Sequence, residues 1–469
     1  AAAAVHCRAL LDAYPQCACR DGAYAIACAA AQAANQHAEA LALARRWKEE
    51  CPASAARATV EEAQALDASG EAGAAEKLLS PYLAPRAQGA PEAAERPRAL
   101  QLLGLACWHQ AEPLFAKADA AAVRLRDFLG GKKLRELDET KRERAAVLRR
   151  EWLDALSAAR EAENRMVAAL SLAVDDYPEL PGRAANLLRL GEAAYDRGQL
   201  DSAMGRYRQA LAADAAGVAD KARYRLGWCA LRQSEKAAGA EKKRLRQEAE
   251  REFAGVARDF PQSPLAGESA WQAAELRRAA RDFAGARPLY EQAREHGRTA
   301  EIRDGAACAA AACLLELRQY REAYDAFKAF AAAAHAGPAK AWLPEANWGA
   351  GFAALKLGAY DEAREYFLAA KAGNYNGEAA AKARYGLGMI EFEQGHWKSA
   401  REEFRKVELF HAAWPEVAAL ARVKAAAASQ ELGEAESAAR DLQRVIDKYA
   451  GAAAVAQARE LLAKMPAGR

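Results

Sequence analysis

The chain has 469 residues, of which 67 are Lys or Arg and 64 are Asp or Glu, so its formal net charge is +3. Because opposite charges nearly cancel, no global field draws the chain onto nucleic acid or an anionic membrane. Ala is abundant and only 16 residues are Pro, a composition that favours helix throughout. No apolar run approaches the roughly 20 residues of a membrane-spanning helix, so we expect no transmembrane segment.

Residues 1–122 show weakly marked helical hairpins. We expect one hairpin over residues 24–36 and 39–50, a second over residues 55–68 and 72–79, and the start of a third at residues 98–110. Four Pro and one Gly between Pro81 and Pro97 predict an exposed loop between the second and the third.

The chain has nine Cys, five of them before residue 52. They are interpreted as small apolar residues buried between helices, with disulfides as the alternative. Cys17 and Cys28 are too far apart to bridge if they share one straight helix. Cys17 and Cys19 lack the spacing of a zinc site, and no downstream pair completes one.

Residues 123–180 depart from the hairpin pattern. Gly130 and Gly131 predict a turn, and residues 132–176 then contain neither Gly nor Pro. They form either one helix of about 40 residues or two abutting helices. This insert is an elongated hairpin whose charged face is solvated, or a projecting hairpin that contacts a partner or a second copy of the chain.

The stretch from Ala184 to Ala215 has the clearest pattern. One apolar helical face carries Leu187, Leu190 and Ala194, and Gly198 marks a turn. A second face follows with Leu200, Ala203, Tyr207, Ala210 and Leu211. We therefore expect two amphipathic helices joined by a tight turn. The small residues Gly191 and Ala203 are expected where the two helices cross.

This arrangement recurs in steps of about 36 to 47 residues, and it resembles the tetratricopeptide repeat, a helix-turn-helix unit of about 34 residues. One copy is longer by about ten residues, over 234–245, which we interpret as a helix extension and a basic loop. The recurring residues are Leu226-Gly227 with Ala249 and Phe253, Phe283 with Ala286 and Tyr290, Tyr320 with Ala323 and Phe327, Gly351 with Gly358, Ala363 and Phe367, Leu387-Gly388 with Gly395, Ala400 and Phe404, and Gly433 with Ala438 and Leu442.

The resemblance implies an all-α fold, a right-handed α-solenoid of about ten repeats with one long-helix insert. The expected division is residues 1–122 for weak repeats, 123–180 for the long hairpin and 181–469 for the regular array. The joint Phe260-Pro261 before Ser263-Pro264 is similar to tetratricopeptide proteins of bacterial envelopes, such as the TolA-binding periplasmic protein and the outer-membrane assembly lipoproteins. A periplasmic or envelope location is therefore expected, with the cytoplasm as the alternative that the odd number of Cys favours.

The sequence contains no pattern typical of an active site. The seven His are scattered and form no metalloprotease helix, Gly130-Gly131-Lys132 lacks the spacing of a phosphate loop, and no nucleophile elbow is present. We expect a protein without enzymatic activity, cofactor or metal.

Stacked repeats curl so that their first helices line the concave side. In each first helix, the residues three before and one after the glycine of the Leu-Gly pair, and the residue about four positions further on, are expected to face this side. These positions carry an aromatic stripe with scattered charges. The rings either fill space between adjacent first helices or form a groove for an extended peptide, with Arg and Lys holding its carbonyl groups or a carboxylate. The stripe contains Tyr195, Tyr224, Trp228, Arg232, Trp271, Arg278, Trp348, Phe352, Lys356, Tyr385 and Phe392.

These expectations lead to a scaffold or adaptor that binds a partner peptide or protein through its concave groove, with no nucleic-acid partner. Because the groove is mixed in charge, it is expected to favour an apolar or extended segment over an acidic tail. Two alternatives are an envelope factor that stacks glycans or lipids on the aromatic stripe, and a structural subunit of a larger complex.

Overall fold

The computed structural model describes residues 2–14, 16–84, 91–213, 215–334, 338–373 and 376–465. These residues form 22 α-helices and four short 3-10 helices, without a strand. None of the helices that they form is long and apolar enough to cross a membrane. The chain divides into two compact units, Ala1–Arg225 and Leu226–Arg469. The predicted all-α class is confirmed.

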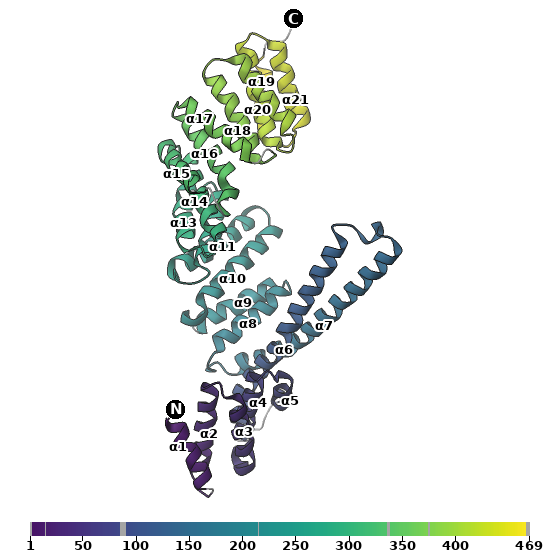
Figure 1. Ribbon diagram of the computed structural model, residues 1–469, viewed down its shortest axis with the longest axis vertical. Coiled ribbons are helices and arrows are strands. Elements are labelled where there is room, and N and C mark those ends of the chain that lie inside the picture. Colours follow the sequence, from purple (N-terminus) through teal and green to yellow (C-terminus); the bar gives the residue numbers. More distant parts are fainter. Residues whose placement is uncertain are drawn as a thin grey trace. The chain divides into compact units, whose positions relative to one another are not determined.

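The first unit consists of successive antiparallel hairpins that follow an opening helix (Figure 1). The predicted hairpins at residues 24–50 and 55–79 are present as α2/α3 and α4/α5. The α-helices of this unit are α1 (Ala2–Ala13), α2 (Arg20–Ala33), α3 (His37–Glu50), α4 (Ala55–Ala68), α5 (Ala72–Leu79), α6 (Pro91–Leu129), α7 (Glu139–Asp176), α8 (Arg183–Asp196), α9 (Leu200–Ala213) and the first part of α10 (Ala215–Lys236).

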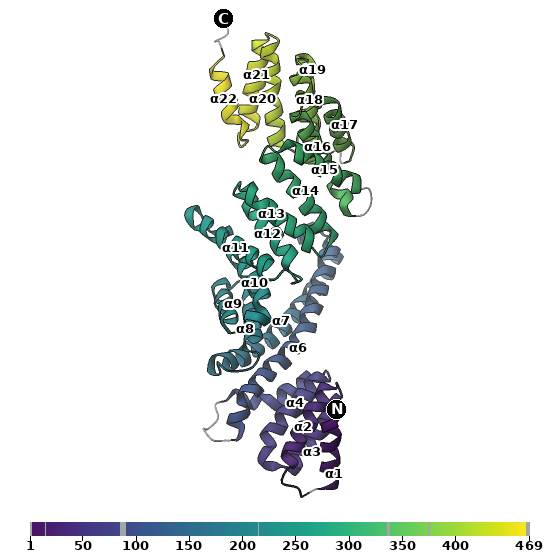
Figure 2. The ribbon, with the colours of Figure 1, turned by 90° about the vertical axis from the view of Figure 1, so that its left-hand side faces the viewer.

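A long hairpin of α6 and α7 stands out in this unit. Figures 1 and 2 show the two helices side by side, extending beyond the neighbouring α4 and α5. Gly130 and Gly131 turn the chain with φ of 52° and 81°. The Asp138 carboxylate then accepts a hydrogen bond from the Lys141 N–H, which begins α7 as one continuous helix.

The structure changes the interpretation of residues 81–110. Residues 98–110 do not open a short repeat, because they belong to the 39-residue helix α6, which contains Pro97 and Pro113 in its interior. A Cβ on Gly104 would overlap the Leu170 side chain of α7, so this Leu-Gly pair serves the long hairpin. The loop expected over 81–97 is replaced at its ends by η2 (Ser80–Leu83) and the first turns of α6; residues 85–90 lie outside the described residues.

The second unit repeats the hairpin in chain order, and each helix packs on the next (Figure 1). Counting from α2/α3 to α20/α21, the described chain contains ten hairpins, of which nine are repeats and one is the long α6/α7 hairpin; the expectation was about ten repeats with one long insert. Besides the end of α10, this unit contains α11 (Gly239–Asp259), α12 (Ala266–Ala279), α13 (Phe283–His296), α14 (Ala300–Glu316), α15 (Tyr320–Ala333), η4 (Pro338–Trp342), α16 (Leu343–Lys356), α17 (Tyr360–Gly373), α18 (Glu378–Glu393), α19 (Trp397–Phe410), α20 (Pro415–Glu431), α21 (Ala435–Lys448) and α22 (Ala454–Ala463).

A glycine of the first helix receives an aromatic ring of the second helix in four hairpins. A Cβ would lie 2.5 Å from Tyr207 at Gly191, 2.8 Å from Phe253 at Gly227, 2.8 Å from Phe367 at Gly351 and 2.7 Å from Phe404 at Gly388. All four rings are fully buried. The Leu-Gly…aromatic pattern therefore records a physical contact, since only glycine lets the two axes approach this closely.

The ten additional residues predicted at 234–245 lengthen both helices of the α10/α11 hairpin. The helix extension is confirmed, whereas the basic segment is helical and not a loop, because α10 continues to Lys236 and α11 starts at Gly239. Leu245 of the extension is buried, so the additional turns pack as part of the hairpin.

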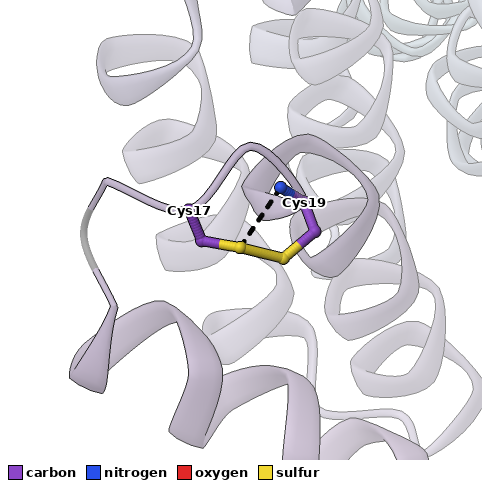
Figure 3. Close-up of a disulfide and its surroundings, with 2 residues drawn as sticks. All are labelled: Cys17 and Cys19. Carbon is purple, nitrogen blue, oxygen red and sulfur yellow. Dashed lines mark hydrogen bonds between the residues drawn. A yellow bond between two sulfur atoms is a disulfide. The ribbon is translucent and has the colours of Figure 1, made fainter.

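A disulfide joins Cys17 and Cys19 in the connection between α1 and α2 (Figure 3). The interpretation of all nine Cys as buried apolar residues was wrong for this pair, because the chain bends between the helices and brings the two Cα atoms to 5.3 Å. The other seven Cys form no disulfide, and Cys28, Cys107, Cys229, Cys308 and Cys313 are buried between helices as expected.

Candidate functional site: the first-helix face

The first helices of successive hairpins in the second unit contact one another in the order α12, α14, α16, α18 and α20. In stacked helical hairpins the first helices form the inner surface. We call the surface that these five helices expose the first-helix face. Nine of the eleven predicted groove residues belong to this unit, whereas Tyr195 on α8 and Tyr224 on α10 belong to the first unit.

Three rings of the predicted stripe pack against the second helix of their own hairpin. Ring centroids are 5.6 Å apart between Trp228 and Phe253, 5.4 Å between Trp271 and Tyr290, and 5.5 Å between Tyr385 and Phe404. All three stripe rings are half-buried. Burial raises the pKa of Tyr385 to about 12. These rings therefore contribute to the packing of their hairpins and present only part of their surface.

Trp271 also fills the space between two first helices. A Cβ on Gly305 of α14 would lie 3.2 Å from the Trp271 ring and 2.9 Å from the ring of Trp342. This contact corresponds to the space-filling interpretation of the stripe. Arg278, on the same helix as Trp271, is held by the Glu275 carboxylate at 2.6 Å and donates to the Tyr290 hydroxyl at 3.1 Å.

The next residues are the predicted groove residues of α8 and α10. The Arg225 guanidinium lies 5.5 Å from the centroid of the Tyr195 ring, and Arg225 is 3.5 Å from the Glu192 carboxylate. Arg232 is exposed on α10. The predicted groove residues before α16 are therefore already engaged in part by neighbouring side chains.

The densest group of predicted residues lies on α16. Trp348 and Phe352 stack with centroids 5.8 Å apart and an interplanar angle of 27°. The Lys356 ammonium lies 5.4 Å from the centroid of Phe352, and the Lys382 ammonium of α18 lies 4.9 Å from the centroid of Trp348. Two first helices thus join rings and cations in one continuous surface.

The same combination continues from α18 to α20. Phe392 contacts Trp397 with centroids 4.9 Å apart, and the Lys424 ammonium of α20 lies 5.2 Å from the Phe392 centroid. Ammonium groups within about 6 Å of a ring are attracted by its negative face, at about 0.5–1 kcal/mol where water has access. We call this set the aromatic–lysine cluster; its members are Trp348, Phe352, Lys356, Lys382, Phe392 and Lys424.

Sequence reasoning missed Lys382 and Lys424. Lys382 lies three residues before the predicted Tyr385, one helical turn earlier on the same face, so extending the position rule by one turn would have found it. Lys424 lies on α20, which contains no aromatic residue, and no signal in its own repeat marks it. Lys382 also forms an ion pair of 2.9 Å with Glu378.

A half-buried carboxyl group, Glu345, lies near the cluster at the start of α16. Burial raises the pKa of Glu345; the Lys382 ammonium acts in the opposite direction, and the Glu378 carboxylate adds to the increase. Lys382 therefore connects the Trp348 ring to the carboxyl groups of Glu345 and Glu378. The surroundings of the cluster are mixed in charge, as the sequence suggested.

The chemistry of the cluster suits non-covalent recognition. Ring edges and lysine stems offer apolar contact, and ammonium groups donate hydrogen bonds to carbonyl or carboxylate oxygens. Among the described residues, no group of three or more His, Cys, Asp or Glu is arranged to hold a metal ion.

No protein-family model matches the sequence, and no curated protein matches it. Solved structures with a similar arrangement include a tetratricopeptide repeat protein from Parabacteroides merdae, with 17% identity, 60% of this chain and 97% of that chain covered, and a TM-score of 0.41. The Cut9–Hcn1 hetero-tetramer of APC/C shares 13% identity with this chain, the match covers 99% of this chain and 93% of that chain, and the TM-score is 0.40.

Yeast Tom70 gives 12% identity, covers 94% of this chain and 88% of that chain, and has a TM-score of 0.36. All of these likenesses lie under 25% identity and under a TM-score of 0.5.

Proposed function

We propose that this chain is a non-enzymatic scaffold that binds an extended peptide segment of a partner protein along its first-helix face. The observation that supports the proposal most directly is the stacked Trp348–Phe352 pair, with the Lys356 and Lys382 ammonium groups over the two rings. A rigid aromatic pair costs little side-chain entropy on binding, and aromatic anchors contribute most of the affinity in many interfaces.

The composition of the aromatic–lysine cluster suggests which peptide it binds. Apolar side chains of the peptide would pack against the edges of Trp348 and Phe352, and the lysines would donate to backbone carbonyl groups or to one carboxylate. Since Glu345 and Glu378 lie beside Lys382, a uniformly acidic peptide would meet repulsion there. The preferred ligand is an extended, largely apolar segment.

A peptide-display selection on the full chain tests this proposal. Selected peptides are measured by fluorescence anisotropy against Phe352→Ala and against a control, Phe410→Ala. Phe410 is 45% exposed at the end of the second helix α19, and it also has a cation over its ring, Arg384 at 4.8 Å. Phe352→Ala should weaken binding about tenfold, while Phe410→Ala should change it less than about twofold.

Two results would contradict the proposal. One is a selection that yields no peptide dependent on Phe352. The other is an equal loss of affinity in the Phe352 and Phe410 variants, with circular dichroism showing that both remain helical.

The two alternative functions have less support from the cluster. Sugar stacking needs an open aromatic face, but Phe352 and the Lys382 ammonium already lie over the Trp348 ring. A purely structural subunit does not need half-buried rings with cations over them. We therefore favour peptide recognition over an envelope glycan- or lipid-handling role and over a purely structural one.

We also propose that the chain works in an oxidising compartment such as the bacterial periplasm or envelope. The Cys17–Cys19 disulfide supports this location, because disulfides persist mainly outside the reducing cytosol. Alkylation of thiols during lysis tests it: Cys17 and Cys19 should resist modification until a reductant is added. Modification of both without a reductant would favour the cytoplasm.

A further inference from the structure

Neighbouring helices of unequal length leave a cavity in the second unit. Helix α11 has 21 residues, whereas α12 and α13 have 14 each. Seven additional residues correspond to about 10 Å of helix. The first turns of α11 and the α12–α13 turn enclose a cavity of about 670 Å³, which extends from Gly239 to Glu250 on α11 and includes Leu276, Ala280 and Asp282.

The charges that line this cavity are unbalanced. Four cations, Lys242, Lys243, Arg246 and Arg277, face two carboxylates, Glu250 and Asp282, which gives a net charge of +2. Arg277 lies 2.8 Å from Glu250 and 3.8 Å from Asp282, so both carboxylates of the cavity already pair with the Arg277 guanidinium. Within the part of the chain that the structure describes, no ion pair involves Lys242, Lys243 or Arg246.

The spacing of these three cations suits an extended chain. Residues three and four apart lie on one face of a helix at about 6 Å, and Arg246 stands in this relation to Lys243 and Lys242. In an extended peptide, alternate residues lie on one side at about 7 Å. Two carboxylates separated by one residue can therefore reach two cations of α11 at the same time.

The wall of the cavity formed by the end of α12 and the turn after it contains the apolar residues Leu276, Ala279 and Ala280 beside the paired charges of Arg277 and Asp282. It suits the intervening side chain of such a peptide, which points away from α11. A nucleic acid would lack its usual stacking partner, because no aromatic side chain lines the cavity. A bilayer would find no large exposed apolar side chain there to insert.

We propose that this cavity binds an extended acidic peptide of a partner protein, in which carboxylates alternate with apolar residues. The peptide's carboxylates pair with Lys242, Lys243 and Arg246, and its apolar side chains pack on Leu276 and Ala280. This site is separate from the aromatic–lysine cluster. It prefers an acidic peptide, whereas the cluster prefers a largely apolar one. One partner with an apolar segment and an acidic segment would occupy both.

Fluorescence anisotropy on the full chain tests the site with a labelled peptide of the pattern Asp-Leu-Glu-Leu-Asp and its neutral counterpart Asn-Leu-Gln-Leu-Asn. The double variant Lys243→Ala, Arg246→Ala should weaken binding of the acidic peptide about tenfold. The control is Arg244→Ala on the same helix, which removes one positive charge and is compared with the single variant Arg246→Ala. Arg244 is engaged by Glu241 at 2.8 Å and Glu248 at 3.2 Å, and its loss should change affinity less than about twofold.

The proposal would be overturned by equal binding of the neutral peptide, by an equal loss in the Arg244→Ala and Arg246→Ala single variants, or by loss of acidic-peptide binding in Phe352→Ala. Binding of an oligouridine or of phosphatidylserine vesicles that is tighter than the acidic peptide's, with the same dependence on Lys243 and Arg246, would overturn it as well. Because Phe352→Ala tests the other site, failure of either proposal leaves the other standing.

Discussion

The repeats from α16 to α21 and the long hairpin of α6 and α7 bury their apolar side chains in different ways. In the repeats, each short helix contacts the following helix, and each first helix also contacts the next first helix. In the distal part of the hairpin, Val123, Val147 and Leu153 are between 42% and 48% exposed. Neighbouring repeats supply the burial that a single hairpin lacks.

This difference appears in the residues at the helix crossings. A Cβ on Gly351 would lie 2.8 Å from the Phe367 ring, and a Cβ on Gly386 of the following hairpin would overlap the same ring. One phenylalanine therefore fixes both its own hairpin and its neighbour. In the distal part of the hairpin, the buried residues of α7 are Ala145, Leu148, Ala155 and Ala159, so alanine and leucine side chains, and no buried ring, fill the seam between the two long helices there.

The largest expected effect concerns Glu408, a buried carboxylate between α19, α20 and α21. Its oxygens accept hydrogen bonds from Lys448 at 2.6 Å and Arg444 at 2.9 Å, and Arg422 also donates to it. Glu408→Gln removes the carboxylate that Lys448 and Arg444 share, while Arg422 keeps Asp441 at 2.7 Å, and should cost about 3 kcal/mol in urea unfolding followed by circular dichroism. The control Glu436→Gln, whose partner Arg440 is 3.8 Å away in an exposed pair, should cost less than about 0.5 kcal/mol. Equal effects would contradict the account.

The same carboxylate predicts how acid affects the C-terminal repeats. Burial by itself raises the pKa of Glu408, but hydrogen bonds from Lys448, Arg444 and Arg422 outweigh burial and lower it to about 2, from an ordinary value of 4.5. A carboxyl group with a depressed folded-state pKa stabilises the fold above its unfolded-state pKa, and this stabilisation is lost as pH falls through the folded-state pKa. The stability difference between the wild type and Glu408→Gln should therefore be constant above pH 4.5 and shrink toward pH 2. A constant difference over that range would show that the charge of Glu408 contributes little.

A smaller effect is expected from Gly386→Ala. In a solvent-exposed helix this change gains up to about 1 kcal/mol, but here the added Cβ overlaps Phe367 and should cost about 2 kcal/mol. Gly205→Ala on α9 is the control, because nothing lies within 4 Å of its Cβ position, and it should stabilise the chain. Urea unfolding decides the sign, and a stabilising Gly386→Ala would show that the glycine–ring contact is not tight.

The smallest effect is expected on the exposed side of the hairpin. Val147 is 48% exposed, and Val147→Lys should change the free energy of unfolding by less than about 0.5 kcal/mol. The adjacent Leu148 is 5% exposed, and Leu148→Ala should cost about 2 kcal/mol. A large loss in Val147→Lys would mean that this side of the hairpin is covered in solution, as expected if it contacts a partner or a second copy.

The regular repeats could be predicted from sequence because their pattern records contacts between neighbours along the chain. Gly191 and Tyr207, or Gly388 and Phe404, are sixteen residues apart and meet within one hairpin. The length of α6 could not be predicted in this way. Gly104 looks like the start of a short repeat, and its partner Leu170 lies 66 residues later.

The candidate site was predictable only in part, for a similar reason. The position rule found Trp348, Phe352 and Lys356, which share one helix. Lys382 and Lys424 come from the next two first helices, so their distance from the rings depends on how neighbouring repeats stack. The cavity beside α11 depends on the difference in length between two hairpins, which a pattern within one repeat does not contain.

The most direct test of peptide binding on the first-helix face is site-specific photo-crosslinking. A photoreactive phenylalanine analogue replaces Phe352 in one sample and Phe410 in another, which keeps an aromatic ring at both positions, and the best display-selected peptide is added before irradiation. If the peptide binds on the first-helix face, position 352 gives a crosslink that excess unlabelled peptide abolishes, and position 410 gives none. A crosslink from position 410 alone, or equal crosslinks from both positions, would contradict binding on that face.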